Sequence, residues 1–259
     1  MVSATAEGLV GAHGGLWLPS PPGCVGAALC LDRVAASVPH GAPLHSPLTR
    51  LLSDLEQQRF ARLPVRKRQI EWLAGRLAAK HALQRLVGIP HWPRQFSVSS
   101  DAAGRPSFDI ARLSISHSRR EAVAVAAHGP VGIDTETFDA VRADSLSLLL
   151  GPDEVLSVRH DWGCDAQVAR TLLWCLKEAL FKAAGGGAFV PFAMALRVRG
   201  WPPAAAQPVW RWQGALAGLQ APAPPVLAHW RADASFTEHA ARVLVSRLSD
   251  VAPLFTESP

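Results

Sequence analysis

The amino-acid sequence predicts an α+β protein, built either as one large domain or as two smaller ones. Two patterns support this fold class. Long segments with apolar residues at helical spacing occupy residues 66–87 and 172–184, and short strand-like runs next to turn-forming residues occupy 122–126 and 131–137. Of the 259 residues, 49% are hydrophobic and 18% are charged, so the chain has enough apolar side chains for a sizeable core.

Composition argues against a membrane-spanning or secreted protein and for an acidic partner. The sequence contains no run of about 18 apolar residues, and residues 1–15 carry no Lys or Arg, so neither a transmembrane helix nor a secretory signal is expected. The four cysteines lack C-x-x-C spacing, which is typical of reduced cysteines in a cytoplasmic protein. The net charge of +5 and pI near 9.5 predict an acidic partner: a polyphosphate cofactor, an acidic protein or a nucleic acid.

The first third of the chain predicts a strand followed by two helices. Residues 1–23 are rich in Gly, Ala, Ser and Pro and are expected to form a poorly ordered arm. A buried strand is expected over Val25 to Arg33. A helix is expected over Leu48 to Leu63, where Pro64 interrupts the helical pattern. A longer amphipathic helix is expected over Arg66 to Val87, where a Gly-Ile-Pro sequence ends it.

Three basic residues and a tryptophan follow one another at four-residue steps along the second helix. They are Arg68, Trp72, Arg76 and Lys80. At about 3.6 residues per turn this spacing predicts a basic ridge with one aromatic side chain. Such a ridge is as often a solvated helix face as a phosphate-binding surface, so both interpretations stay open.

The middle of the chain predicts a loop and three strands. Asp101 to Pro106 is rich in turn-forming residues, and Leu113 to Ser118 is expected to be a strand that ends in an exposed turn. Ala122 to Ala126 and Val131 to Thr137 are expected to pair as an antiparallel hairpin across a His-Gly-Pro connection.

The last of these strands carries two carboxylates. Strand alternation places Asp134 and Glu136 on the same face, where they repel each other unless a cation or basic group lies between them. The next long helix adds Glu178, one turn before Lys182. A Glu–Lys pair at this spacing is common and contributes only a few tenths of a kcal/mol, but three carboxylates together are ligands that suit Mg²⁺.

The helix that carries Glu178 has two distinct sides. The apolar side consists of Leu172, Leu173, Leu176, Leu180, Ala183 and Ala184. The other side consists of Trp174, Lys177, Glu178, Phe181 and Lys182. Asp165 or Thr171 is expected to start this helix, and three glycines beginning at Gly185 are expected to end it.

The rest of the C-terminal part predicts one or two short helices over residues 138–170, one of them beginning at Pro152, and then strands. The expected strands are Val209 to Gln213, Val226 to Ala232 and Ala241 to Leu248. Residues 251–259 are expected to form a loose tail.

Two segments stand in a specific order and spacing. A Gly-Ile-Asp-Thr-Glu strand at residues 132–136 precedes, by about 40 residues, a Trp-Cys-Leu-Lys-Glu-Ala-Leu-Phe-Lys helix at 174–182. The pair resembles the signature of the 4′-phosphopantetheinyl transferases, and the chain length is similar to that of the monomeric, Sfp-type branch. The segments Arg68 to Arg76, Gly104 to Pro106 and Leu113 to Ser118 also match motifs of that family.

The resemblance implies a fold and a reaction. The fold is a pseudo-dimer of two similar α/β halves, each a small antiparallel sheet packed with a long helix, expected here over residues 24–130 and 131–250. The reaction is transfer of 4′-phosphopantetheine from coenzyme A to a serine of an acyl or peptidyl carrier protein, releasing adenosine 3′,5′-bisphosphate. A cytoplasmic, monomeric enzyme is implied.

The resemblance also implies residue roles. Asp134, Glu136 and Glu178 are expected to hold Mg²⁺, or Mn²⁺ in its place. Glu178 is the expected base for the serine proton, directly or through water, although a carboxylate bound to a metal loses basicity. The residues expected to bind coenzyme A are Arg68, Arg76, Lys80, Arg105, Ser116, His117 and Lys182, and all of them except Ser116 are expected to contact its phosphates. Lys182 is also expected to stabilise charge on the leaving group.

Two other functions remain open at this point. Another Mg²⁺-dependent phosphotransferase acting on a nucleotide needs the same carboxylates but no carrier protein. A basic module that binds nucleic acid through the ridge of the first long helix is the second alternative, and it leaves the three carboxylates without a purpose.

Overall fold

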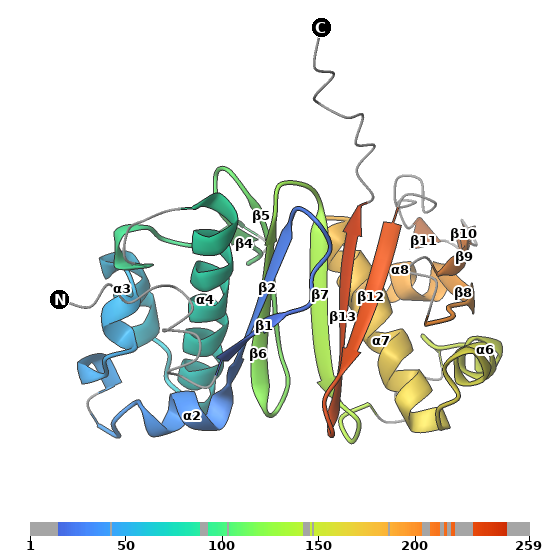
Figure 1. Cartoon of the computed structure of the whole chain (residues 1–259), viewed down its shortest axis with the longest axis horizontal. Coiled ribbons are helices and arrows are strands. Elements are labelled where there is room, and N and C mark those ends of the chain that lie inside the picture. The colour runs from blue at the N-terminus through green and yellow to red at the C-terminus, as the bar shows by residue number, and fades with distance from the viewer. Residues whose placement is uncertain are drawn as a thin grey trace, which may run out of the picture.

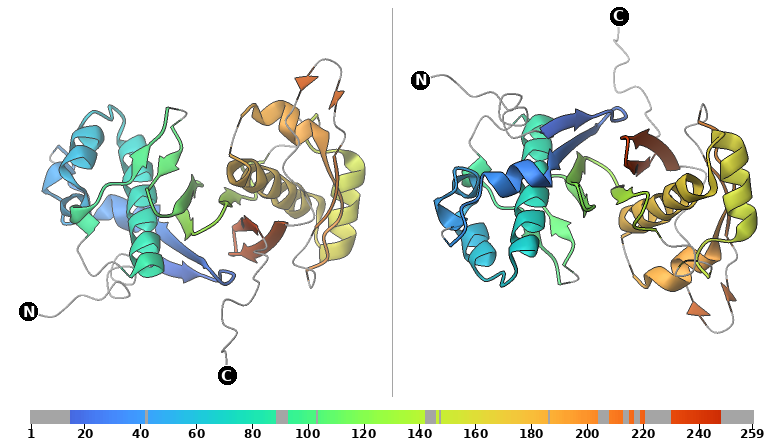
Figure 2. Two further views of the ribbon diagram at one scale, coloured as in Figure 1. Left: turned by 90° about the horizontal axis from the view of Figure 1, so that it is seen from above. Right: turned by 90° about the horizontal axis from the view of Figure 1, so that it is seen from below.

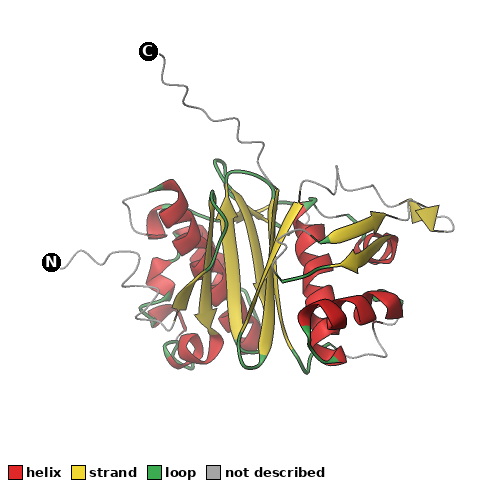
Figure 3. Ribbon diagram, turned by 45° about the vertical axis from the view of Figure 1, so that its right-hand side comes forward, coloured by secondary structure: helices red, strands yellow, loops and turns green. Residues whose placement is uncertain are grey.

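Two antiparallel β-sheets lie side by side at the centre of the molecule, and helices cover the outer face of each (Figure 1, Figure 3). The structure is a computed structural model, and it describes residues 15–41, 43–88, 93–102, 104–141, 146, 148–185, 187–203, 208–212, 215–216, 219–220 and 230–247. Views from above and below show the N-terminal elements on one side and the C-terminal elements on the other (Figure 2).

The first sheet is formed by the N-terminal half of the chain. Its strands run in the order β1 (Gly15–Leu18), β2 (Cys24–Cys30), β6 (Glu121–Ala127) and β5 (Arg112–His117). Helix α4 (Arg66–Val87) packs across its outer face and ends at Gly88, which adopts a left-handed conformation with φ +68°. Helix α4 therefore has the bounds that the sequence predicted.

The second sheet is formed by the C-terminal half. Its strands run in the order β12 (Trp230–Phe236), β13 (Ala240–Arg247) and β7 (Val131–Thr137). Helix α7 (Ala166–Ala183) covers its outer face and α6 (Pro152–Trp162) packs on α7. Asp165, one of the two predicted starts, caps α7 by accepting hydrogen bonds from the backbone N–H groups of Gln167 and Val168, both at 2.8 Å.

Shorter elements connect these layers. The helical ones are α2 (Leu31–Ala36), η1 (Pro43–His45), η2 (Thr49–Leu51), α3 (Asp54–Ala61), η3 (Pro93–Gln95) and α8 (Phe189–Ala195). The short strand pairs are β3 (Ser99–Ser100) with β4 (Pro106–Ser107), β8 (Leu196–Gly200) with β9 (Val209–Trp212), and β10 (Ala215–Leu216) with β11 (Leu219–Gln220). In the part of the chain that the structure describes, no helix is long and apolar enough to cross a lipid bilayer.

Strand alternation divides the apolar side chains among separate cores. On β6, Ala122, Ala124 and Ala126 face the cluster under α4. Val123 and Val125 instead face a cluster that also contains Ile133 of β7, so the two sheets share an apolar seam. A further cluster surrounds α7. The seam is where the two halves of the chain meet.

The two halves repeat one topology. The first half runs β2, α3, α4, β5, β6 and places β6 between β2 and β5. The second half runs β7, α6, α7, β12, β13 and places β13 between β7 and β12. The predicted α+β pseudo-dimer is therefore confirmed.

A buried ion pair repeats at matching places in both halves. Glu56 on α3 accepts a backbone hydrogen bond from Val98 at 3.0 Å and forms an ion pair with Lys80 of α4 at 2.6 Å. In the second half, Glu154 on α6 accepts from the backbone N–H of Val198 at 2.8 Å and pairs with Lys177 of α7 at 3.0 Å. Each pair fixes the long helix of its half against the preceding helix.

The predicted hairpin between residues 122 and 137 is wrong. Strand β6 pairs with β2 and β5 on its two edges, so β7 has no free edge of β6 to join and pairs with β13 instead. The connection at residues 128–130 carries the chain from one sheet to the other.

Three other boundaries differ from expectation. The strand predicted over Val25 to Arg33 ends at Cys30, because helix α2 begins at Leu31. The helix predicted over residues 48–63 begins only at Asp54, because Ser53 and Glu56 form a capping box that starts α3 there. The predicted arm over residues 1–23 overlaps β1, which pairs with β2; residues 1–14 lie outside the described residues, as does the predicted tail over 251–259.

Among the C-terminal strands, β9, β12 and β13 fall where strands were expected, with β12 shifted toward residue 236. The predicted strand residues 213, 226–229 and 248 lie outside the described part.

Helix α7 packs unusually close to β7 at Gly132. An added Cβ at this position would lie 1.9 Å from the backbone oxygen of Ala179, which is far inside van der Waals contact. Glycine is therefore the residue that allows the helix bearing Glu178 to approach the strand bearing Asp134.

Gly132→Ala should destabilise the protein by about 3 kcal/mol or more, because the helix or the strand must move to admit the methyl group. The measurement is thermal unfolding, with Gly129→Ala as the control, since a Cβ at Gly129 has no heavy atom within 4 Å. Equal melting temperatures for the two variants would contradict this close packing.

Candidate functional site

A cluster of carboxylates and one lysine lies at the seam. Lys182 Nζ on α7 is 2.7 Å from Asp134 Oδ1 on β7 and 3.3 Å from Glu178 Oε2, one turn earlier on its own helix. Asp134 is almost completely buried, with 1% of its surface exposed, whereas Glu178 and Lys182 keep about a quarter of their side chains exposed. The lysine is thus held between two carboxylates at the edge of the solvent.

The first half contributes directly to this cluster. The Ser116 hydroxyl on β5 donates a hydrogen bond of 2.6 Å to Asp134 Oδ1, and Lys182 Nζ lies 3.3 Å from the same hydroxyl. Next to it, the Ser114 hydroxyl accepts a hydrogen bond from the backbone N–H of Ile133 at 3.1 Å. Serines on alternate positions of β5 therefore join the two halves at the site.

Glu136 lies on the same face of β7 as Asp134. Burial and then the negative charges of Asp134 and Glu178 raise the pKa of Glu136 from 4.5 to about 7. Lys182 and a hydrogen bond from Trp174 act in the opposite direction but offset only part of this increase.

The pKa values of Glu178 and Lys182 are also shifted from their ordinary values. Burial and the Asp134 carboxylate raise the pKa of Glu178, although Lys182 lowers it. Burial lowers the pKa of Lys182, but the charges of Asp134 and Glu178 raise it by more, so its net shift is upward. The cluster has an excess of negative charge that one lysine does not neutralise.

The chemistry of these residues fits a divalent cation. Asp134 Oδ2 is buried and has no hydrogen-bond partner among the described residues, so it is available as a hard oxygen ligand. Burial and the neighbouring carboxylates raise the pKa values of Glu136 and Glu178, so a further positive charge nearby would stabilise their ionised forms. In the described residues, however, no three His, Cys, Asp or Glu side chains are gathered closely enough to form a metal site, and Lys182 occupies the space beside Asp134 Oδ1.

A cavity of about 450 Å³ lies in the first half, between α4 and β5. It brings together three of the predicted phosphate-binding residues, Arg68, Arg76 and His117. Arg59 of α3 also lines it, together with Trp72. The cavity thus combines several cationic groups with an aromatic ring.

The basic residues of the cavity differ in how firmly they are held. Arg68 is 69% exposed and 3.8 Å from Glu71. Arg76 is largely buried, donates to the backbone oxygen of Val98 at 2.7 Å and lies over the ring of Trp72 at 4.9 Å. Burial lowers the pKa of Arg76 to about 10, although Glu56 opposes that shift.

Two lysines do not lie where the helix pattern placed them. Lys80 was expected on the basic ridge, but it is fully buried, with Nζ bound to Glu56 and 2.5 Å from the backbone oxygen of Phe96. Lys177 was expected beside Glu178 on the polar side of α7, but it is also fully buried beside Glu154, and burial lowers its pKa to about 8. Both are held in the core by carboxylates from neighbouring helices, which helical periodicity does not reveal.

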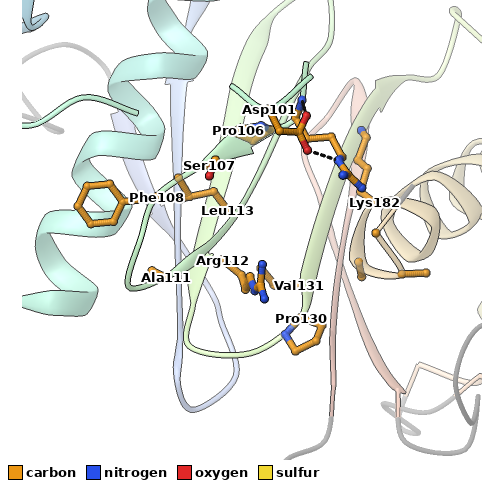
Figure 4. Close-up of a pocket in the computed structure, with 14 residues that line it drawn as sticks. Asp101, Pro106, Ser107, Phe108, Ala111, Arg112, Leu113, Pro130, Val131 and Lys182 are labelled. Atoms are coloured by element: carbon orange, nitrogen blue, oxygen red, sulfur yellow. Dashed lines mark hydrogen bonds and ion pairs between the residues drawn. The ribbon is translucent and has the colours of Figure 1, made fainter. Parts of the chain in front are cut away.

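A second cavity, of about 340 Å³, lies between β4–β5 and the end of α7 (Figure 4). Lys182 faces it from α7, and Arg105 and Arg112 line it from the first half. Arg105 forms an ion pair of 2.6 Å with Asp101.

A smaller cavity of about 230 Å³ joins the other two. It shares Gly104 and Ile115 with the cavity beside α4, and Arg105 and Lys182 with the cavity in Figure 4. The three cavities therefore lie next to one another in a row that leads from the arginines of the first half to Lys182 of the second, and we call this row the groove.

Sequence reasoning missed two arginines of this groove. Arg59 lies on α3, whose start was misplaced, and Arg112 opens β5 just before the segment that was recognised. The resemblance implies that Ser116 binds the cofactor, and in the structure its hydroxyl is hydrogen-bonded to Asp134 and Lys182.

A groove lined with arginines that leads to buried carboxylates and a lysine is typical of an enzyme that acts on a phosphate-containing substrate. Comparison with known proteins agrees with this class. Residues 56–127 match the model of the 4′-phosphopantetheinyl transferase N-terminal domain, and residues 130–213 match that of the 4′-phosphopantetheinyl transferase superfamily.

Curated relatives carry related names. A holo-acyl-carrier-protein synthase of Halalkalibacterium halodurans is 37% identical over 84 residues, which is 29% of this chain and 70% of the relative. The 4′-phosphopantetheinyl transferase gsp of Aneurinibacillus migulanus is 28% identical over 62% of this chain and 68% of the relative. Enterobactin synthase component D of Salmonella austin is 34% identical over 46% of this chain and 48% of the relative. The chain belongs to the 4′-phosphopantetheinyl transferase superfamily.

Glu136→Gln should remove a pH-dependent loss of stability. The pKa of Glu136 is about 7 in the folded protein against 4.5 ordinarily, so the folded state binds more protons than the unfolded state between these values. Stability of the wild type therefore falls as pH rises through that window, and the variant lacks this contribution.

The measurement is the melting temperature of the wild type and the variant in the absence of divalent cations, at a pH below 4.5 and at a pH above about 7. The variant should gain stability relative to wild type on the alkaline side by a few degrees, and little on the acidic side. A difference between variant and wild type that does not change with pH would contradict the assigned pKa.

Proposed function

We propose that this protein transfers 4′-phosphopantetheine from coenzyme A to a serine hydroxyl of an acyl or peptidyl carrier protein, with Mg²⁺, and releases adenosine 3′,5′-bisphosphate. The observation that carries the proposal is the row of adjacent cavities that leads from the arginines beside α4 to Lys182, which itself contacts Asp134 and Glu178. Coenzyme A has a phosphorylated adenosine at one end and a pyrophosphate in the middle, and the groove offers cationic groups at both places.

The cavity beside α4 suits the phosphorylated adenosine. Arg59, Arg68, Arg76 and His117 supply positive charge or hydrogen-bond donors for the 3′-phosphate. Trp72 supplies an aromatic face at the same place. Arg105 and Lys182 then lie along the groove toward the pyrophosphate. Lys80 is not part of this surface, because it is buried against Glu56.

The reaction breaks one P–O bond and forms another. The serine oxygen attacks the phosphorus that carries pantetheine, and adenosine 3′,5′-bisphosphate leaves with the bridging oxygen. Lys182 stabilises the charge on the phosphate oxygens, and Glu178 accepts the serine proton. Burial and the Asp134 carboxylate raise the pKa of Glu178, which makes it a stronger base than an exposed glutamate while no metal is bound to it.

Asp134, Glu136 and Glu178 would hold the divalent cation, although their side chains are not gathered into a metal site among the described residues. Asp134 Oδ2, which has no hydrogen-bond partner in the described part of the chain, is the first candidate ligand. When bound, the cation neutralises pyrophosphate charge and orients the leaving group. The residues of the chain position the cofactor and move the proton.

The direct experiment incubates the protein with an apo-carrier protein, coenzyme A and Mg²⁺, followed by mass spectrometry of the carrier. The expected result is a mass gain of one phosphopantetheine group on the carrier serine, together with adenosine 3′,5′-bisphosphate in solution. Carriers from fatty acid, polyketide and nonribosomal peptide systems should be tested in parallel. Turnover of a nucleotide without any carrier would favour another phosphotransferase instead.

Glu178→Gln and Lys182→Ala should each lower kcat, on the order of a hundredfold or more for a lost general base. Raising Mg²⁺ should not restore Glu178→Gln, because added metal does not supply a base. Arg94→Ala is the matched control, since Arg94 forms an exposed ion pair with Asp54. Complete rescue of Glu178→Gln by Mg²⁺ would leave Glu178 as a metal ligand only.

Arg68→Ala should raise KM for coenzyme A by about tenfold, since a charge-assisted phosphate contact contributes roughly 1.5 kcal/mol or more. KM for dephospho-coenzyme A, which lacks the 3′-phosphate, should change much less. Lys67→Ala is the control, because Lys67 is 75% exposed and also lies beside Glu71 but does not line the cavity. Equal losses for both cofactors would place Arg68 away from the 3′-phosphate.

A further inference from the structure

A buried charge pair joins the two halves away from the carboxylate–lysine cluster. Arg242 on β13 donates from Nε to Glu121 Oε1 on β6 at 2.6 Å, and from Nη2 to Glu121 Oε2. The hydroxyl of Thr135 on β7 donates to Glu121 Oε1 at 2.8 Å. We call these three residues the seam cluster.

The seam cluster has little access to water. Arg242 is 6% exposed, Glu121 is 8% exposed and Thr135 is fully buried. The neighbouring part of the seam is apolar, with Val123 and Ile133 among its members. A charge pair in such surroundings is strong only while both partners are present, because either charge alone is left unpaired in the interior.

Residues of the seam cluster lie directly beside residues of the proposed site in both halves. The backbone oxygen of Glu121 accepts from Ser118 N–H at 2.8 Å and so closes the turn that follows His117. On the other side, Arg242 stands opposite Thr135 in the β13–β7 register. Thr135 lies between Asp134 and Glu136 in β7, with its side chain on the opposite face.

The cluster therefore links the turn beside the arginine-lined cavity with the strand that carries the carboxylates. His117 lines that cavity, and Asp134 contacts Lys182 at the other end of the groove. A ligand that spans the groove must engage both ends at once, and this simultaneous binding is favourable only if their separation is held constant.

We propose that Glu121, Thr135 and Arg242 are positioning residues that set the separation of the two halves for binding of coenzyme A. This inference rests on the proposed function. It assigns to the seam cluster an effect on ligands that bridge both halves, and no effect on ligands that occupy one half alone.

The test uses the double variant Glu121→Met/Arg242→Met. Replacing a buried ion pair with apolar side chains of similar volume leaves no unpaired charge, so the fold should be retained. Titration calorimetry then compares wild type and variant with coenzyme A and with adenosine 3′-phosphate, which has only the group expected beside α4. Thermal unfolding on the same samples reports stability.

Coenzyme A should bind the double variant about tenfold more weakly, because the two ends of the ligand no longer engage together at full effective concentration. Adenosine 3′-phosphate should bind both proteins equally. The single variant Glu121→Gln, which leaves Arg242 without its charge partner, should lose coenzyme A affinity and melting temperature together.

A folded double variant that binds coenzyme A as tightly as wild type would overturn the inference, since the pair would then serve stability alone. Equal weakening of both ligands would also overturn it, because the effect would not depend on bridging. Failure of wild type to bind coenzyme A would contradict the proposed function itself.

Discussion

The burial of Asp134 at the boundary between two sheets is the constraint on which the rest of the site depends. A carboxylate that is 1% exposed needs positive charge and hydrogen-bond donors, and it finds them on both sides of the seam: Lys182 from α7 and Ser116 from β5. Gly132 lets α7 come close enough to β7 for this contact. Because Asp134 binds groups from both halves, docking the two sheets and assembling the site are the same event.

The repeated topology explains how one chain provides two different surfaces. Each half fixes its long helix with a buried lysine against a glutamate of the preceding helix, Lys80 with Glu56 and Lys177 with Glu154. With the helices held in this way, α4 presents arginines to the groove, while α7 presents Lys182 to it and holds Glu178 beside Lys182. The shared framework serves stability, and the difference between the halves serves the proposed chemistry.

Much of the fold and part of the candidate site were predictable from the sequence. Periodicity gave the bounds of α4, and strand alternation placed Asp134 and Glu136 on one face. The pairing of β7 with β13, more than 100 residues away along the chain, was not predictable, because local pattern says nothing about which edge of a sheet is already occupied. The burial of Lys80 and Lys177 was missed for a similar reason: their partners lie on other helices. The cluster of Glu121, Thr135 and Arg242 likewise requires the folded seam.

The most direct test of the central claim is an experimental structure of the protein with coenzyme A and Mg²⁺. The account predicts one cofactor molecule lying along the groove, with its 3′-phosphate beside Arg68, Arg76 and His117 and its pyrophosphate beside Lys182. It also predicts the cation on oxygen atoms of the Asp134, Glu136 and Glu178 carboxylates. Coenzyme A held entirely within one half, or a cation bound elsewhere, would contradict the claim that the seam is the active site.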